Sequence, residues 1–581
     1  MRFPNHLLLI ALAGFFGAAP AIAQEAHEHR DPEPAVGQVY FPISCSPDAQ
    51  RRFNRAVAWL HSFEYDRAGQ EFAAISETDP DCAMAYWGAA QSSYHPLWAP
   101  PGPAELKAGL AATEKAASIR ARTRRENDYI AAIAVFYKDY DKLDYHRRAL
   151  AYEQAMERVR RRYPQDREAA VFYALSLNAT ALATVPADKS YLKQKKAAAI
   201  LNAVLREQPR HPGVAHYLIH SYDYPQLAAL ALPAARSYAR IAPGSAHALH
   251  MPSHIFTRLG LWRESIKSNL ASEAAAKSHA AEARMTGAWD EQLHAMDYLT
   301  YAYLQGSQDK KAAHVLDEIQ GIRRAEPENF KVAYAFAAVP ARYALERRDW
   351  TAAAHLTERA DFPWDRFPYA SAITNFARAI GSARTGDTAA AHKDVEALAA
   401  IQKGLVGAKD NYDWSVQVEI QRRAAAAWLA HAEGNDAEAL RLMREAADLE
   451  DSTEKHPVTP GPVLPARELL GDLLLEAKQP SEALKQFETS LVNSPNRNYG
   501  LYGAARAAEL CGNRAAAARY RREIKRLCRF ADTDRADLQQ LSYRVLSEPP
   551  ARSRQRVKCI GHDSKKAATK GRIESGASLS L

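Results

Sequence analysis

Hydrophobic positions along most of this chain recur three and four residues apart, in segments of helical length separated by short polar turns. The clearest case is the segment 470–477 followed by the segment 481–487, with Pro495 after the second. This spacing places apolar side chains on one face of a helix. A helical pair cannot bury such a face alone, so the pattern predicts pairs that stack on each other.

The pattern has a period of 34 residues, which is typical of the tetratricopeptide repeat (TPR). Ala483, the small residue where two paired helices cross, is followed one period later by Ala517. Two insertions rich in Pro and Gly, His95–Pro103 and Asp451–Pro465, predict loops. We therefore expect an all-α, TPR-type solenoid of helical pairs with irregular insertions. Weaker copies of the crossing residue occur at Ala68, Ala197, Ala231, Ala312, Ala391 and Ala439.

The N-terminus combines a positive charge at Arg2, an apolar run from Leu7 to Phe16 and the small-residue site Ala21-Ile22-Ala23. This order is typical of a secretory signal peptide cleaved after Ala23. No stretch reaches the roughly 18 apolar residues that a membrane helix needs. We therefore expect an exported bacterial chain, periplasmic or secreted, with no transmembrane helix after cleavage.

These features divide the chain into five expected parts. They are a signal peptide (1–23), an extended segment (24–48), an N-terminal TPR-like half with a histidine-rich groove (49–284), a C-terminal TPR array (285–531) and a C-terminal extension (532–581). The extension is basic and poor in large apolar residues from about residue 549, which predicts disorder there. Most of the net charge of +8 comes from this tail. A nucleic-acid surface would need basic residues on a folded face, so none is expected.

Five cysteines leave at least one thiol without an intramolecular partner. Cys511 and Cys528 fall in the last helical pair and are candidates for a bridge, whereas Cys45 and Cys82 flank the first pair; the fifth is Cys559. Export would permit disulfides. No C-x-x-C motif occurs, so the thioredoxin-type and c-type haem motifs are missing.

Histidines concentrate in two successive repeats. Positions 2, 5, 9, 12 and 13 of the first helix of a TPR face the groove. His216 and His220 take positions 5 and 9 of one repeat, and His250 and His254 take the same positions 34 residues later. Each pair is spaced i, i+4 and lies on one helix face. Four imidazoles are therefore expected to converge on the concave surface.

The same register assigns further polar residues to the groove. They are His247 at position 2, Asp223 at position 12, His61 and His95 at position 13 of the first two repeats, and His294 and Asp297 at positions 2 and 5 of a later repeat.

Three interpretations of this histidine set remain open. The rings could be ordinary hydrogen-bonded residues of the core or surface. They could recognise an anionic or peptide ligand in the groove. They could also bind a divalent transition metal such as Zn or Cu, since neutral imidazole is its commonest ligand. The metal set would be His216, His220, His247, His250 and His254, with Asp223 as ligand or support.

Pro252 complicates the second histidine pair. Proline removes a backbone donor and suits the first turn of a helix, so a helix is expected to begin near Pro252. His247 and His250 would then lie on a loop or distorted turn, and the pairing of His250 with His254 would be lost.

Several blocks resemble a group of exported bacterial TPR proteins, over roughly residues 50 to 320. The resemblance implies the TPR fold and export, and it marks the histidine blocks as a signature of the group. It implies no assigned reaction or substrate. The blocks are Leu60 to Tyr65, Cys82 to Gly88, His95 to Trp98, His216 to Asp223, and His247 to Phe256.

Two functional hypotheses follow. The first is a scaffold that binds a protein or peptide partner in its groove. The second is a metal-binding protein or metal-dependent enzyme that uses the histidine cluster. The sequence contains no H-E-x-x-H, no G-x-S-x-G, no phosphate loop and no dinucleotide fingerprint, so it indicates no enzyme class.

Overall fold

The computed structural model describes residues 35–184, 188–408 and 412–532. All of them belong to one compact unit. The expected signal peptide and the tail from residue 533 lie outside the described residues.

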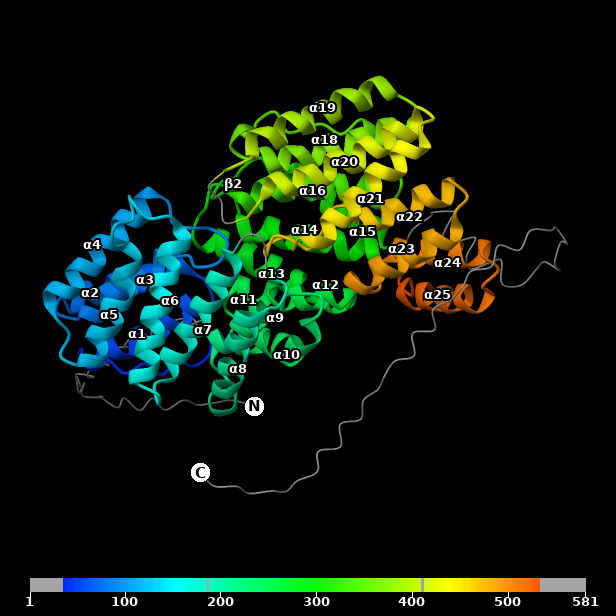
Figure 1. Cartoon of the computed structure of the whole chain (residues 1–581). Coiled ribbons are helices and arrows are strands. Elements are labelled where there is room, and N and C mark those ends of the chain that lie inside the picture. Colours follow the sequence, from blue (N-terminus) through cyan, green and yellow to red (C-terminus); the bar gives the residue numbers. More distant parts are fainter. Residues whose placement is uncertain (1–34, 185–187, 409–411, 533–581) are drawn as a thin grey trace, which may run out of the picture. The chain divides into compact units, whose positions relative to one another are not determined.

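Helices make up nearly all of the regular structure in the described ranges, so the all-α prediction is confirmed (Figure 1). The first helices are α1 Pro47–His61, α2 Tyr65–Thr78, α3 Ala83–Ser92, α4 Pro103–Ile119, α5 Arg124–Tyr137, α6 Tyr145–Arg162, α7 Arg167–Leu182, α8 Leu192–Glu207, α9 Pro212–Tyr222, the 3₁₀ turn η1 Ala228–Ala231, α10 Leu232–Ile241, α11 Ala246–His250, α12 Pro252–Arg258 and α13 Trp262–Glu282.

The second part of the chain continues the series. Its helices are α14 Asp290–Gln305, α15 Asp309–Gly321, α16 Phe330–Glu346, α17 Trp350–Ala354, η2 Trp364–Arg366, α18 Pro368–Thr385, α19 Thr388–Leu405, α20 Trp414–Ala432, α21 Asp436–Ser452, α22 Ala466–Glu476, α23 Pro480–Asn493, α24 Asn498–Leu510 and α25 Arg514–Leu527. Two short strands, β1 Ala288–Trp289 and β2 Ala325–Glu326, pair in parallel and were not predicted.

The helices pack as a series of stacked pairs. Each helix contacts the next one, and alternate helices also touch, as in α3 with α5, α7 with α9, α18 with α20 and α22 with α24. Contact between alternate helices aligns the first helices of successive pairs along one side, which is the arrangement expected for a TPR-type solenoid.

Small residues allow the paired helices to cross closely. A β-carbon at Gly471 in α22 would lie 2.6 Å from the Phe487 ring of α23, and one at Gly88 in α3 would lie 2.3 Å from the Phe72 ring of α2. Atoms cannot approach this closely, so both crossings require glycine opposite the aromatic ring. Each crossing therefore places a glycine of one helix against an aromatic ring of the paired helix.

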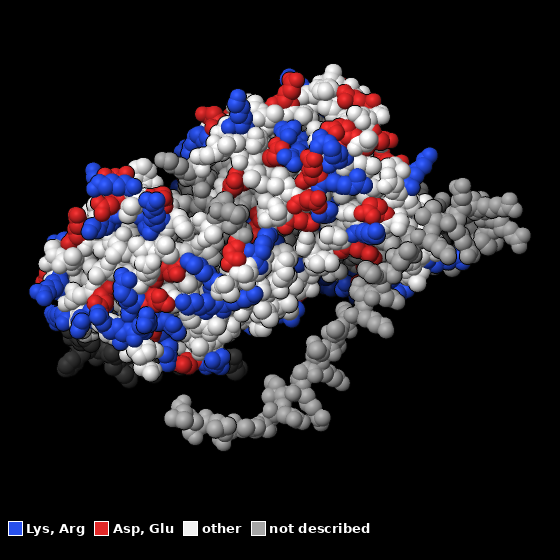
Figure 2. Space-filling model, viewed as in Figure 1, with Lys and Arg blue, Asp and Glu red and all other residues white. Residues whose placement is uncertain are grey.

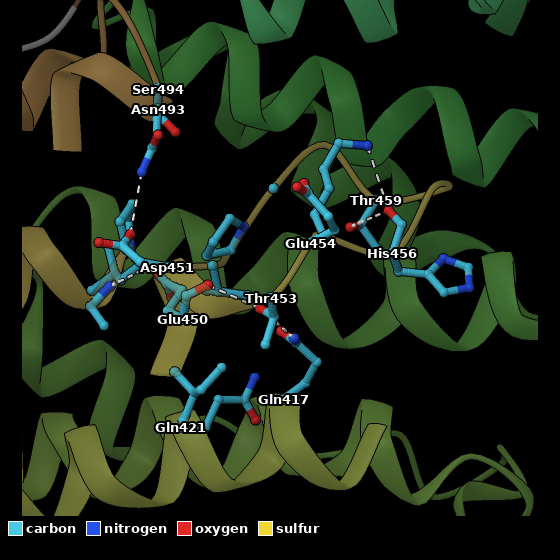
Figure 3. Close-up of a pocket in the computed structure, with 18 of the residues that line it drawn as sticks. Gln417, Gln421, Glu450, Asp451, Thr453, Glu454, His456, Thr459, Asn493 and Ser494 are labelled. Atoms are coloured by element: carbon cyan, nitrogen blue, oxygen red, sulfur yellow. Dashed lines mark hydrogen bonds between the residues drawn. The ribbon is translucent and has the colours of Figure 1, made fainter. Parts of the chain in front are cut away.

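Both predicted insertions are loops. The first lies between α3 and α4, and the second lies between α21 and α22. In the second, Lys455 reaches back to Asp223 at 3.0 Å, and Arg342 of α16 donates to the Gly461 carbonyl at 2.8 Å. Figure 3 shows residues of this loop, among them Thr453 and Thr459, at a cavity that has a volume of about 160 Å³ and is also lined by residues of α18, α20, α21 and α23. The loop thus connects the C-terminal repeats to α9 and α16.

Cys45 and Cys82 form a disulfide between the start of the chain and α3. Among the described residues no disulfide joins Cys511 to Cys528, whose Sγ lies 3.2 Å from both Ser307 Oγ and Asn498 Nδ2.

Lys, Arg, Asp and Glu side chains are interspersed on the face seen in Figure 2. In the described ranges, no helix combines the length and apolar character needed to cross a membrane.

Candidate metal centre

Helix α9 carries the first histidine pair. It begins at Pro212 and is capped by His211, whose Nδ1 accepts the Val214 N–H at 3.3 Å. His216 and His220 lie one turn apart on this helix, and their Nε2 atoms are 3.0 Å apart. His216 is fully buried, so this helix face points into the protein.

Helices α11 and α12 carry the second block. Ser245 caps α11, and Pro252 takes the first turn of α12 as predicted. The expected distorted turn is wrong, because Met251 keeps helical angles (φ −52°, ψ −36°) and continues the helical path. His250 and His254 therefore stay on one face, with their Nε2 atoms 3.0 Å apart.

The first histidine group, group A, consists of His216, His220 and His247. The Nε2 of His247 lies 3.2 Å from the Nε2 of His216. The Nδ1 of His216 donates to the His61 carbonyl at 2.7 Å, which aims its Nε2 at the other two rings. The Nδ1 of His247 lies 3.7 Å from a Glu291 oxygen.

The second group, group B, consists of His250, His254 and His294 of α14. The ring centroids of His250 and His294 are 4.1 Å apart. Asn269 of α13 donates its amide N–H to the Ser265 carbonyl, which leaves its Oδ1 to accept from His250 Nδ1 at 2.6 Å. His254 Nδ1 similarly lies 3.1 Å from an Asp223 oxygen.

These partners determine which nitrogens carry protons. Asn269 Oδ1 and the Asp223 carboxylate only accept hydrogen bonds, so Nδ1 of His250 and of His254 must be protonated. Burial lowers the pKa of His250, and it lowers that of His254 to about 4 against the opposing effect of Asp223, so both rings are neutral. Their Nε2 lone pairs therefore face each other at 3.0 Å with no proton between them. The Tyr298 hydroxyl lies 3.3 Å from His254 Nε2 and 3.1 Å from the Val458 carbonyl, and a cation between the two imidazoles would satisfy both of their lone pairs.

Three of the other rings are also kept available as ligands. Burial, reinforced by neighbouring imidazoles, holds the pKa values of His216, His220 and His294 well below the ordinary value. Metals bind neutral imidazole, and an ion 2.0–2.1 Å from each of two nitrogens separates them by about 3.3 Å at the tetrahedral angle. The distances of 3.0 and 3.2 Å fit this geometry.

Aromatic side chains enclose both groups. Phe63 packs on His216 with centroids 4.4 Å apart, and Trp98 lies 5.5 Å from His220 and 5.9 Å from His247. Tyr298 covers group B, 4.7 Å from His250, and its hydroxyl donates to the Val458 carbonyl at 3.1 Å. Both insertions therefore contribute to the enclosure, the first through Trp98 and the second through Val458.

Asp223 connects the centre to the second insertion. Its carboxylate is buried and accepts from Arg258 at 2.9 Å and from Lys455 at 3.0 Å, as well as from His254. Although burial alone would raise the pKa of Asp223, the two cations hold it well below its ordinary value. Asp223 is thus an ionised support for His254, and the loop at Lys455 helps to position it.

Two cavities reach group A from different sides. A cleft of about 840 Å³ extends to His247 and is lined by Tyr65, His95 and Trp98, among others. A more apolar pocket of about 240 Å³ reaches His220. A small molecule could therefore approach the histidines without unfolding of the surrounding helices.

Three residues assigned to the groove lie apart from the histidine groups. His61 is fully buried, and its ring bonds to Glu168 and Tyr217, so only its backbone carbonyl touches group A. His95 lines the cleft, 3.5 Å from Glu105. Asp297 is buried in an ion pair with Arg342 at 3.1 Å. His294, also assigned to the groove, instead belongs to group B.

Sequence reasoning missed several residues that support the centre. Asn269, Glu291 and Tyr298 stand at helical positions with no distinctive local motif, and their role depends on helix packing. Phe63 and Trp98 had a signal, because they lie in blocks that carried the family resemblance.

No family model matches this chain, and no curated protein matches it in sequence. Solved structures that are similar include human IFIT1 as a dimer with m7Gppp-AAAA, at 11% identity and a TM-score of 0.35, over 78% of this chain and 90% of that one. The Cut9–Hcn1 hetero-tetramer of APC/C has 11% identity and a TM-score of 0.30, over 86% and 84% of the two chains. The P58(IPK) TPR domain has 12% identity and a TM-score of 0.20, over 80% and 99%. These low scores carry no information on function, and the fold assignment rests on the helices described above.

Proposed function

We propose that this chain is a transition-metal-binding protein in which groups A and B each hold one ion, zinc or copper. The observation that carries the proposal is the opposed pair of unprotonated nitrogens on His250 and His254. Buried lone pairs facing each other are costly, because a buried polar atom without a partner loses its hydration. A bound cation removes that cost.

The surroundings favour borderline metals over magnesium or calcium. Among the described residues, groups A and B consist of imidazole alone, and imidazole suits Zn and Cu, whereas Mg and Ca prefer oxygen. In His216, His250 and His254, the nitrogen that does not face the ion is held by a backbone carbonyl, an amide and a carboxylate respectively, as is usual for metal-bound histidine. Three protein ligands leave a position open for water or substrate, which is compatible with metal-dependent catalysis.

The test is the metal content of untagged protein, measured by elemental mass spectrometry. We expect about two ions per chain, and about one in each of the variants His216→Ala and His250→Ala. His392→Ala is the matched control, since that exposed ring pairs with Glu433 outside the centre. Circular dichroism would establish that each variant is folded. Metal-free wild-type protein that also takes up no added Zn or Cu would refute the proposal.

Export to the periplasm or beyond the cell is proposed from the N-terminal sequence. The Cys45–Cys82 disulfide supports it, because disulfides persist in oxidising compartments and are rare in the cytosol. Fractionation of cells that express the full chain should recover it outside the cytoplasm, with Gln24 as the first residue by mass spectrometry. Recovery in the cytoplasm with Met1 or Arg2 retained would contradict export.

Partner binding in the large cleft is a second candidate function. The cleft of about 840 Å³ combines aromatic side chains such as Tyr65 with charged side chains of both signs, which suits a peptide that offers apolar and charged groups. Binding of an immobilised peptide library should weaken in Tyr65→Ala while metal content stays the same. Equal binding by wild type and variant would exclude the cleft as the binding surface.

A further inference from the structure

The two histidine groups share their helices. His247 of group A and His250 of group B lie three residues apart on α11, and His254 follows on the same helical path. Residues three and four apart lie side by side on a helix, so the ligands of group A and group B follow one another along the same helix face. Groups A and B therefore lie next to each other.

Ring distances show how the groups join. Within group A, the centroids of His216 lie 4.7 Å from His220 and 5.0 Å from His247. Between the groups, His220 lies 6.4 Å from His254, and His247 lies 6.4 Å from His250. His250 and His254 close the circuit at 4.9 Å. Five imidazoles thus form a closed circuit of neighbouring rings, and the His294 ring lies 4.1 Å from His250 at an interplanar angle of 47°.

Two ions inside this circuit would be close together. With each ion about 2 Å from its Nε2 ligands, we place the ions on the order of 4 to 6 Å apart, near the spacing of known two-metal sites. Two divalent ions at this distance repel strongly in a buried site.

The described side chains offer no anion inside the circuit to reduce that repulsion. Both groups consist of imidazoles alone. The Asp223 carboxylate is turned to the outer nitrogen of His254, and Glu291 approaches the outer nitrogen of His247. An anion between the ions must therefore come from solution, and the cleft at His247 and the pocket at His220 both provide access.

We propose that groups A and B form a single dinuclear centre, in which the open positions of the two ions face each other and bind one small anion as a shared ligand. This inference rests on the proposed metal-binding function and extends it, because independent sites would satisfy that function equally well. The ligand class is a small anion such as hydroxide or azide, which fits between two ions without displacing histidine.

The test uses wild-type protein loaded with two equivalents of Cu(II) and titrated with azide. A shared anion couples the two unpaired electrons, so we expect fewer than half of the bound copper ions to give an EPR signal. Azide should saturate at one per two copper ions. A full EPR signal from both ions, or one azide per copper, would overturn the dinuclear proposal and leave metal binding intact. Uptake of neither Cu nor Zn would overturn it together with the proposed function.

Single-group variants provide the matched comparison. His294→Ala should lose copper from group B and leave one ion with its full EPR signal and weak azide binding. Control variant His392→Ala should behave as wild type. If His294→Ala keeps two copper ions and a reduced signal, the ions do not occupy groups A and B as assigned.

Discussion

Two clusters of buried histidines lie among helices α1 to α14, and they differ in the groups that the imidazole nitrogens contact. In the first, Glu168 stands between His61 and His211, with carboxylate–imidazole distances of 2.9 and 2.8 Å. In the second, made of groups A and B, imidazole nitrogens face one another. Both clusters are buried, so burial does not distinguish them.

The difference lies in whether the ring nitrogens of each cluster have hydrogen-bond partners when no ion is bound. The remaining nitrogens of the first cluster are also occupied, since His61 Nδ1 contacts the Tyr217 hydroxyl at 2.9 Å and His211 Nδ1 accepts the Val214 N–H. Every polar atom has a partner, so this cluster serves structure. The pair His250 and His254 lacks a proton between its facing nitrogens. A set of close, buried histidines therefore indicates a metal site only where their protons cannot satisfy one another.

The largest expected effect is the loss of stability on metal removal. When the free metal concentration is roughly 1,000 times the Kd, the bound ion adds about 4 kcal/mol to the free energy of unfolding. Wild-type protein treated with a strong chelator should therefore melt several degrees lower, as followed by circular dichroism during heating. The doubly substituted protein His216→Ala/His250→Ala should show no chelator-dependent shift. A shift that persists in that variant would place the ion elsewhere, with the His61–Glu168–His211 cluster as the alternative site.

Substitution Glu168→Gln tests the other cluster. Removing one member of a buried charged network costs on the order of 3 kcal/mol, so the variant should unfold at a lower denaturant concentration with its metal content unchanged.

The two imidazoles lower the pKa of Glu168 well below its ordinary value despite burial. Its stabilising effect is therefore present above the ordinary carboxyl pKa and is lost as the pH falls below it. The variant should show less acid sensitivity than wild type between about pH 5 and 2. Loss of metal in this variant would contradict the comparison.

Local features of the centre could be predicted from sequence. The i, i+4 spacing placed His216 with His220 and His250 with His254, because helical geometry alone determines which side chains share a face. The repeat period similarly predicted the stacked pairs, and the local Pro and Gly content predicted both insertions as loops. These expectations depend on residues close together in the chain.

Other features depend on contacts between helices and could not be predicted. Position 13 assigned His61 to the groove, but α1 packs against α9 and buries that ring against Glu168. His294 was separated from the metal set, yet contact between α11 and α14 brings it onto His250. Repeat register describes an ideal solenoid, and side chains that fill the groove change which positions face solvent.

A smaller effect is expected from Asn269→Ala. The amide holds Nδ1 of His250, and loss of such a support usually weakens metal binding 10- to 100-fold, or about 1.4–2.7 kcal/mol. Competition with a chromophoric chelator would measure the change. Asn202→Ala is a matched control, because Asn202 makes the same bond to a carbonyl four residues earlier, at 2.9 Å, without a histidine partner. Equal loss in both variants would mean that Asn269 acts through helix stability and not through His250.

The smallest effect should be kinetic and should come from Trp98→Ala. The Trp98 ring lines the large cleft and packs beside His220 and His247, so its removal should let a chelator reach the ions sooner. We expect severalfold faster metal release with the equilibrium affinity nearly unchanged, since Trp98 donates no ligand. Trp289→Ala is the control: that ring lines the same cleft but packs on His279, at 4.3 Å, rather than on group A. Stopped-flow transfer to a chelator would compare the two rates. Equal rates in both variants would show that ions leave by another route, and the pocket at His220 would then be the path to examine.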